Sequence, residues 1–336
     1  MSEIIVHVTR GGRVESMHRG DVAVVDGEGR VKASLGDPAR ETYFRSAAKP
    51  LQALNVIFSG AADRFGLTQD ELAVTCGSHY AEDFHRAAVT SILRKAGIPV
   101  EKLKSPPGPS IKYSLALKQA ASGRTLDAVD SNCSGKHSGM LAACVAKGYP
   151  LDGYMEPDHP VQRDIVAILA EMCGVPADAI GIGEDGCGVP VHYMPLSAMA
   201  RGYARLATPV GLPEDWRSAC ARVCDAMNAH PEMVAGTGGF CTELMRHTDG
   251  RFVAKIGAEA VYCVGVVGRD MGIALKVDDG NGNRPIPVTV MHILKQLGLF
   301  PDGVPEGLLR FARPQVKNDH GHIAGDLRPV FSLDAR

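Results

Sequence analysis

The sequence lacks an excess of charge of either sign. Its 336 residues include 36 Lys and Arg against 38 Asp and Glu, which gives a formal net charge of −2. Recognition of nucleic acid requires a clustered positive excess, so this balance excludes a dedicated nucleic-acid binder. We therefore expect no nucleic-acid partner.

Long hydrophobic runs are also missing. The longest nearly uncharged apolar stretch, Ala260 to Gly268, is about half of what a membrane span requires, so no membrane partner is expected. Residues 1–5 have neither a basic segment nor a long apolar one, and a secretory signal is not expected. The nine cysteines are odd in number and scattered, which is typical of free thiols in a reducing compartment, and we expect a cytoplasmic protein.

Apolar residues make up 45% of the chain, enough for a sizeable core. Strand patterns occur near both ends of the chain: Ile4–Val8, Asp21–Asp26, Val31–Leu35, Phe252–Ile256, Ala260–Val267, Gly272–Val277 and a late edge strand within His322–Leu333. Helical patterns are concentrated between them: Ala47–Ser59, Glu82–Ala96, Ser138–Lys147, Pro160–Cys173, Pro195–Leu206 and Pro213–Ala229, with Pro287–Leu297 after the last strands.

This order predicts an α+β fold, in which a mostly antiparallel sheet is flanked by helices and closed by distant segments. We expect one catalytic unit over residues 1–336. The sheet lobe takes about 1–60 and 230–336, and the helical insert takes about 61–229.

Ser46-Ala47-Ala48-Lys49 begins a predicted helix. Positions i and i+3 share a helix face, so the amine of Lys49 is expected within reach of the hydroxyl of Ser46. An amine whose pKa is lowered can act as the base for a serine nucleophile. The alternative is that Ser46 only caps the helix.

Lys255-Ile256-Gly257 lies on a predicted returning strand. Ser-x-x-Lys, a helical insert and then Lys-x-Gly is the order found in serine β-lactamases and penicillin-binding proteins, where the Gly admits substrate backbone. Ser78, in Cys76-Gly77-Ser78-His79, is either a helix cap or a second hydroxyl paired with Lys255.

Two Gly-rich loops, Ser131–Gly139 and Glu184–Pro190, each hold cysteine and ionisable groups. Cys133, His137 and Cys187 can supply zinc ligands, although no Cys-x-x-Cys or His-x-x-x-His spacing is present. A Cys133–His137 nucleophile pair is a second possibility, and Gly135 argues against a helix between these two residues. The third possibility is that both loops are ordinary turns with no chemical role.

Together these segments resemble the Rhizobium etli-type L-asparaginases, a family related in fold to serine β-lactamases. The matching segments are Ser46–Gln52, Cys76–His79, Asn132–His137, Asp185–Gly188 and Lys255–Gly257. The resemblance implies hydrolysis of L-asparagine to L-aspartate and ammonia by a homodimer. Ser46 is then the nucleophile with Lys49 as its base, and Ser78 with Lys255 relays a proton to the departing ammonia.

The resemblance also implies a zinc ion, held by Cys133, Lys136 and Cys187. It implies four substrate-binding residues: Arg45, Lys136, His137 and Asp185. One departure is Gly239, at the end of the turn Ala235–Gly239 predicted over the cleft, where the family resemblance leads us to expect a larger, basic residue.

Three other functions share some of these residues. A penicillin-binding or β-lactamase-like acyl hydrolase uses Ser46, Lys49 and Lys255. A zinc-dependent amidohydrolase depends on the metal instead of Ser46. A non-catalytic amino-acid sensor binds asparagine without releasing ammonia.

Overall fold

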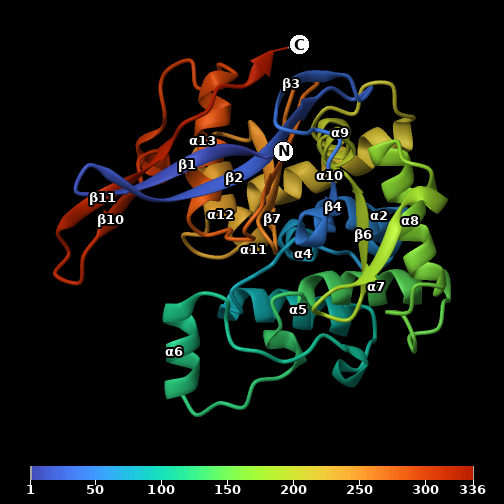
Figure 1. Ribbon diagram of the computed structural model, residues 1–336. Helices are drawn as coiled ribbons and strands as arrows, with labels where there is room; N and C mark the ends of the chain where they lie inside the picture. The colour runs from blue at the N-terminus through green and yellow to red at the C-terminus, as the bar shows by residue number, and fades with distance from the viewer. Residues whose placement is uncertain (1, 336) are drawn as a thin grey trace.

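The computed structural model describes residues 2–335, and its largest element is a nine-stranded sheet (Figure 1). Along the main path of this sheet the strands are β10 (Gln315–Lys317), β11 (Ile323–Pro329), β1 (Glu3–Arg10), β2 (Arg13–Val25), β9 (Gly272–Val277), β8 (Val261–Val266) and β7 (Phe252–Gly257). Strand β3 (Val31–Leu35) pairs with β2 and with β12 (Asp334–Ala335).

The sheet is closed by segments that are far apart in the sequence. Strand β2 pairs with β9 from Gly20 opposite Val277 to Val25 opposite Gly272, and every pairing between described strands is antiparallel. The predicted α+β class with a mostly antiparallel sheet is therefore confirmed. The late strand β11 is not an edge strand as predicted, because β10 pairs along its outer side.

Helices fill the middle of the chain and recur after β9, and several of them pack on the large sheet. They are α3 (Ala61–Arg64), α4 (Gln69–Thr75), α5 (Asp83–Lys95), α6 (Tyr113–Ala121), α7 (Ser134–Lys147), α8 (Pro160–Cys173), α9 (Leu196–Ala207), α10 (Glu214–Ala229), α11 (Pro231–Val234), α12 (Phe240–Arg246), α13 (Pro285–Gln296) and α14 (Leu309–Ala312). Helix α9 packs on β9, β8 and β2, so part of the predicted insert lies against the sheet lobe.

The segment predicted as one helix over Ala47–Ser59 is broken in the structure. It forms a 3-10 turn η1 (Arg45–Ala48) followed by two short helices, α1 (Lys49–Gln52) and α2 (Leu54–Phe58). Pro50 has no N–H to continue the hydrogen-bonding ladder into this turn, so it is accommodated only at the start of α1. Ser46 and Lys49 therefore lie on either side of a helix start, not on one continuous helix face.

The expectation that Gly135 prevents a helix is wrong. Helix α7 begins at Ser134, so Gly135 lies in its first turn. A Cβ at this position would lie 2.1 Å from the carbonyl oxygen of Val74, on the neighbouring helix α4. The glycine is required by the close packing of two helices, a long-range cause that local helix propensity does not contain.

A second sheet links the Gly-rich loop Glu184–Pro190 to the start of η1. It contains β4 (Glu41–Tyr43), β6 (Pro190–Pro195) and β5 (Gly181–Glu184). The backbone N–H of Phe44 donates to the carbonyl oxygen of His192 at 2.8 Å. The small sheet thereby fixes residue 45 and the turn that follows it.

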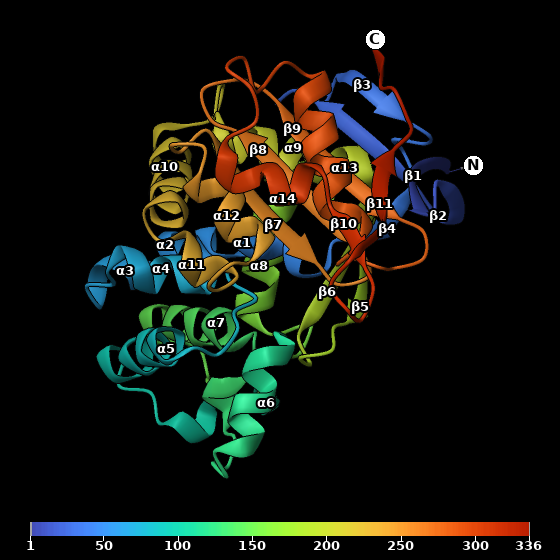
Figure 2. The same ribbon diagram turned by 90° about the vertical axis from the view of Figure 1, so that its left-hand side faces the viewer.

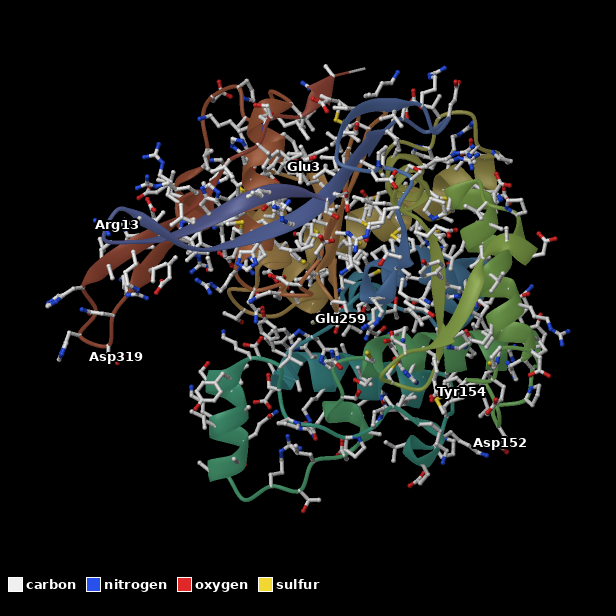
Figure 3. The ribbon with its side chains drawn as sticks, viewed as in Figure 1. Glu3, Arg13, Asp152, Tyr154, Glu259 and Asp319 are labelled. Carbon is white, nitrogen blue, oxygen red and sulfur yellow. The ribbon has the colours of Figure 1, made fainter. Side chains whose placement is uncertain are left out.

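One end of the large sheet projects from the body as an arm, made of β1, residues 13–19 of β2, β10 and β11 (Figure 1). Arg13 and Asp319 lie at the tips of its two hairpins (Figure 3). All nine cysteines, in contrast, are free and buried in the body. Among residues 2–335, no helix is long and apolar enough to cross a membrane.

Candidate active site

The hydroxyl of Ser78 lies between two buried lysine amines. Lys49 Nζ donates to Ser78 Oγ at 2.9 Å, and Lys255 Nζ donates to the same oxygen at 3.0 Å. Ser78 follows α4, and its backbone N–H donates to the carbonyl oxygen of Val234 at 2.9 Å, which fixes the loop. The structure thus brings together three of the predicted catalytic residues. Ser78 is 29 positions from Lys49 and 177 positions from Lys255 in the sequence.

Lys255 has the electrostatic environment of a proton acceptor. Its side chain is fully buried on β7, and burial lowers its pKa to about 7, with a further contribution from the positive charge of Lys49. Its second hydrogen bond is to the carbonyl oxygen of Ile256 at 2.7 Å. An amine with a pKa near 7 can both accept and donate a proton at neutral pH.

Ser46 and Lys49 do not form the direct contact expected from their spacing. The backbone N–H of Lys49 donates to the carbonyl oxygen of Ser46, but no hydrogen bond joins their side chains within the described residues. The amine of Lys49 points instead to Gly77 O at 2.6 Å, to Ser78 Oγ and to Cys133 Sγ at 3.2 Å. Ser46 is half-buried on η1, whereas Ser78 is only 6% exposed. The two serines therefore differ in accessibility and in the number of amines that they contact.

Gly257, at the end of β7, packs against the turn that carries Ser46. A Cβ at this position would lie 3.1 Å from both the backbone nitrogen of Ala47 and the carbonyl oxygen of Phe44. The glycine of the Lys-x-Gly motif thus makes room for η1, whereas the sequence led us to expect that it makes room for substrate backbone. This contact holds Ser46 and Lys255 in neighbouring parts of one site.

Arg45 and Asp185 form an ion pair beside Ser46. The guanidinium of Arg45 contacts Asp185 Oδ1 through Nε at 3.0 Å and through Nη2 at 2.9 Å. Burial disfavours the carboxylate of Asp185, but Lys136 and Arg45 outweigh it and lower its pKa. Arg45 adopts φ +49°, a left-handed conformation that is costly for a residue with a side chain and that is found preferentially at functional sites.

Cys133, Lys136 and Cys187 form the third part of the site. Lys136 Nζ contacts Cys187 Sγ at 3.0 Å. A hydrogen bond from Cys187 lowers the pKa of Cys133 well below its ordinary value; burial opposes this, and the charge of Lys49 supports it. Burial also favours the neutral amine of Lys136, but Cys187 and Cys133 outweigh it and raise its pKa.

The fit of this group to zinc depends on Lys136. Two thiols and one amine supply the sulfur and nitrogen donors that zinc accepts, and the contacts above bring them together. Within residues 2–335, no group of three or more His, Cys, Asp or Glu side chains can hold a metal ion. A zinc site here therefore requires the amine of Lys136 as a ligand in its neutral form.

Two buried histidines face this group with nitrogens that have no partner within the described residues. His137 Nδ1 contacts the hydroxyl of Tyr154 at 2.7 Å, and its Nε2 has no hydrogen bond. Both ring nitrogens of His192 on β6 lack a partner, and burial lowers the pKa of His192 to about 4. Sequence reasoning missed His192, because the strand that carries it was not recognised.

A cavity of about 370 Å³ adjoins Ser78 between α12, α14 and β7, which lie close together in Figure 2. The turn Ala235–Gly239 lines it, as the predicted position over the cleft implies. A Cβ at Gly239 would lie 2.8 Å from the hydroxyl of Tyr80, so a larger residue there would have to displace this tyrosine. Tyr80 and Cys241 also line the cavity, and neither was predicted as a site residue.

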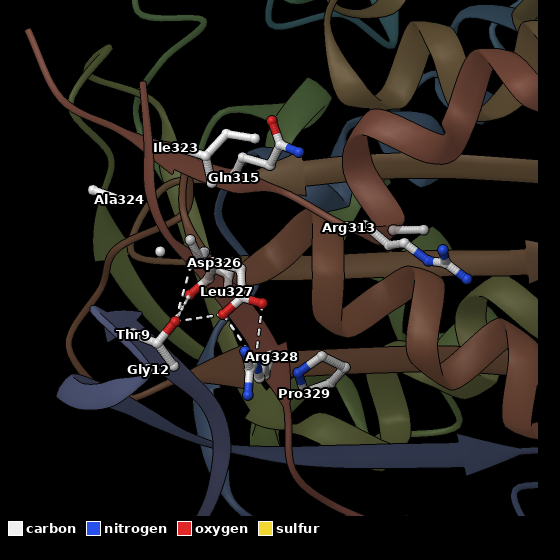
Figure 4. Close-up of a pocket in the computed structure, with 12 residues that line it drawn as sticks. Thr9, Gly12, Arg313, Gln315, Ile323, Ala324, Asp326, Leu327, Arg328 and Pro329 are labelled. Atoms are coloured by element: carbon white, nitrogen blue, oxygen red, sulfur yellow. Dashed lines mark hydrogen bonds and ion pairs between the residues drawn. The ribbon is translucent and has the colours of Figure 1, made fainter. Parts of the chain in front are cut away.

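Another cavity, between β1 and β11 on the arm, does not adjoin any of these residues (Figure 4). Its polar groups bond to one another: Thr9 contacts the carboxylate of Asp326, and Arg328 Nε donates to Asp326 Oδ1 at 2.8 Å. Because these groups already satisfy each other, we assign the candidate active site to the Ser78 region.

Comparisons with known proteins give one family and several distant structures. The family model described as L-asparaginase II matches residues 6–329. A protein of Bacteroides dorei, provisionally named a beta-lactamase, is 17% identical with a TM-score of 0.42, and the alignment covers 82% of this chain and 92% of that one. No curated protein matches the chain.

Mglu is a second structural neighbour. Its native form in 4.3 M NaCl is 16% identical with a TM-score of 0.36, and the alignment covers 84% of this chain and 60% of Mglu. Its L-glutamate-binding form is 16% identical with a TM-score of 0.36, and the alignment covers 83% and 59%. The chain thus spans less than two thirds of the length of Mglu in these two structures.

Proposed function

The chain belongs to the L-asparaginase II family, and on that premise we propose that it hydrolyses L-asparagine to L-aspartate and ammonia by a serine–lysine mechanism. Family membership makes the chain an amidohydrolase, which sets aside the non-catalytic sensor. The observation that carries the mechanism is the contact of one serine hydroxyl, Ser78, with two buried lysine amines.

In the first step, Ser46 Oγ attacks the carbonyl carbon of the substrate side chain. Its greater exposure supports this role. The amine of Lys49 donates to three acceptors, so it first passes one proton through Ser78 to the neutral amine of Lys255. It then takes the proton of Ser46. The backbone N–H of Ser78 is occupied by Val234, so the N–H of Ser46 is the better donor to the oxyanion, at about 3 kcal/mol for such a contact.

In the second step, the carbon–nitrogen bond breaks. Ammonia is a poor leaving group unless its nitrogen receives a proton. The chain Lys49–Ser78–Lys255 supplies one: Ser78 protonates the nitrogen and recovers a proton from a lysine amine. Water then hydrolyses the aspartyl ester and regenerates Ser46.

The opposite assignment has one observation in its favour. Ser78 already contacts Lys255, an amine with a pKa near 7, so Ser78 with Lys255 can also serve as the attacking pair. Acid quench during turnover, followed by peptide mass spectrometry, separates the two assignments. An aspartyl ester on Ser46 supports our proposal, and an ester on Ser78 contradicts it.

Substrate charges match the remaining residues. The carboxylate and ammonium groups of asparagine need fixed charges of both signs, which Arg45 and Asp185 provide beside Ser46. Lys136 adds a positive charge only in the metal-free site, because as a zinc ligand it is neutral. His137 is proposed to orient the substrate through its unpartnered Nε2. The geometry of these residues supports a small, doubly charged amino acid as the substrate.

Zinc is part of the proposal, with Cys133, Lys136 and Cys187 as its ligands. When bound, the ion would supply positive charge that orders the two loops and attracts the substrate carboxylate. Metal analysis of the purified protein tests this. Binding of one zinc ion in the wild type and its loss in Cys133→Ala supports the ligand set, whereas equal zinc content in both contradicts it.

A homodimer in the cytoplasm completes the proposal. The arm exposes the apolar side chains of Val14, Met17 and Ile323, a surface that a second subunit can cover. Nine free cysteines support a reducing compartment. Light scattering measures the oligomeric state directly, and a monomer at micromolar concentration contradicts the dimer.

The decisive experiment is an ammonia-release assay with L-asparagine, run beside L-glutamine and nitrocefin. We expect steady release from asparagine that is abolished in Ser46→Ala. One extra methylene in glutamine should cost roughly 10- to 200-fold in kcat/KM. Nitrocefin turnover without ammonia release would instead favour the β-lactamase alternative.

A further inference from the structure

The cavity beside Ser78 is larger and more apolar than the release of ammonia requires. Its volume of about 370 Å³ lies in the range of pockets that enclose ligands much larger than ammonia. Its walls include Ile111, Phe240, Ile256 and Phe311. The rings of Phe240 and Phe311 are 4.9 Å apart, so one wall is an aromatic surface.

The position of Ser78 indicates that the cavity lies next to the bond that is hydrolysed. Ser78 lines the cavity on one side and contacts Lys49 and Lys255 on the other. Under the proposed function, Ser78 protonates the leaving nitrogen, so that nitrogen lies next to Ser78. A substituent on this nitrogen therefore has the cavity directly in front of it. Ser46, Arg45 and Asp185 do not line the cavity, which leaves the groups that hold the amino acid outside it.

We propose that the cavity accepts the apolar substituent of a secondary amide, so that the enzyme also hydrolyses L-asparagine derivatives whose side-chain nitrogen carries an alkyl group. The inference rests on the proposed function, because the role of Ser78 gives the orientation. An alkyl group on the side-chain nitrogen can contact the apolar walls, whereas the hydrogen of unsubstituted asparagine is too small to do so. Burial of each methylene is favourable.

The reaction balances with water as its only co-reactant. The carbon–oxygen bond to Ser46 forms first and gives the oxyanion. The carbon–nitrogen bond then breaks, and its electron pair goes to nitrogen. Nitrogen takes the proton from Ser78 and leaves as a primary amine in place of ammonia. Water then cleaves the ester to give L-aspartate, so no oxidant or reductant takes part.

The experiment compares three substrates on the purified full chain, by amino-acid analysis of the common product L-aspartate. They are L-asparagine, N4-methyl-L-asparagine and N4-butyl-L-asparagine. Methylamine and butylamine have nearly the same basicity, so the last two differ mainly in apolar contact. We expect kcat/KM for the butyl compound to exceed that for the methyl compound roughly tenfold.

Two variants test the location of the effect. Ile111→Trp places a large ring at the exposed edge of the cavity and is expected to remove the butyl preference. The matched control, Val210→Trp, places the same ring at an exposed position that belongs to neither the candidate active site nor the arm, and it should retain the preference. A butyl preference that survives Ile111→Trp unchanged would overturn the inference.

The outcomes separate this inference from the proposed function. Hydrolysis of asparagine with a butyl compound no better than the methyl compound overturns the inference alone. Absence of aspartate from all three substrates overturns both. Hydrolysis of the butyl compound without hydrolysis of asparagine supports the cavity and corrects the preferred substrate.

Discussion

The candidate active site and the arm both contain many charged residues, but in opposite environments. In the site, Lys49, Lys136 and Lys255 are 1%, 4% and 0% exposed. On the arm, the ion pair of Arg10 with Glu15 has side chains 49% and 48% exposed. Water and salt screen the arm pair, so it contributes little to stability. The lysines of the site lack that screening, and each costs free energy to bury.

This difference indicates that the candidate active site keeps charged groups whose burial lowers the stability of the fold. Replacing buried ionic groups with apolar residues of similar size is often neutral or stabilising, so the fold alone does not require three buried lysines. Perturbed, buried ionisable groups are typical of functional sites. Four experiments can break or sharpen this contrast, and each includes a variant on the arm.

The largest effect is expected from Ser78→Ala. This change removes the hydroxyl shared by two lysines and should lower kcat for asparagine at least about a thousandfold, since a nucleophile or a proton donor is lost. The control is Ser16→Ala, an exposed serine on the arm, which should leave kcat unchanged. Steady-state ammonia release measures both, and equal rates would contradict the assignment of the site.

Lys255→Met should lower activity and raise stability. Because burial lowers the pKa of Lys255 to about 7, the folded protein binds fewer protons at this residue than the unfolded chain between pH 7 and 10.5. Stability from this group therefore rises with pH across that window and is lowest below pH 7. Methionine removes the penalty, by on the order of 2 kcal/mol at pH 6 and by less at pH 10.

Urea unfolding at the two pH values measures the difference. Lys317→Met, at an exposed position on β10, is the counterpart and should change stability by less than about 0.5 kcal/mol. Destabilisation in Lys255→Met at pH 6 would show that the buried amine holds the fold together.

The pH dependence of turnover should follow the same amine. The neutral form of Lys255 is needed to accept a proton from Ser78, so kcat/KM should rise with pH through an apparent pKa of about 7. Arg10→Ala on the arm should leave this profile unchanged. A profile that is flat from pH 6 to 8 would remove Lys255 from the proton path.

The smallest effect is expected for the arm pair itself. Arg10→Ala and Glu15→Ala should each change the free energy of unfolding by less than about 1 kcal/mol, and high salt should reduce even that. Urea unfolding at low and high salt provides the measurement. A larger loss would mean that the arm carries more of the stability than its exposure indicates.

Elements with strong local signals were predicted well. Helix α8 has the predicted bounds, Pro160–Cys173, because a proline at its first turn and Gly174 after its end mark both limits. Strand β9 also has its predicted bounds, Gly272–Val277. The start of α7 was misplaced, since only the packing of Gly135 against Val74 explains the glycine in its first turn.

In the candidate active site, too, features with a local sequence signal were predicted and most features set by long-range packing were not. The sequence identified the residues that carry its chemistry, because Ser-x-x-Lys and the two cysteine loops are unusual in composition. It also identified the contact of Ser78 with Lys255, but it did not identify the contact of Ser78 with Lys49. The amine of Lys49 bonds to the hydroxyl of Ser78, 29 residues away, and not to the hydroxyl of Ser46, and local spacing does not contain such a long-range contact. His192 lies on a strand whose pairing partners are distant in the chain.

The burial of all nine cysteines has a practical consequence. A bulky maleimide dye needs a thiol at the surface, and the native chain presents none. Cysteine introduced in place of Asp319, an exposed residue at the tip of one hairpin of the arm, would give one attachment point per chain, away from the body (Figure 3). The enzyme could then be tethered to a support or carry a fluorophore in one defined orientation.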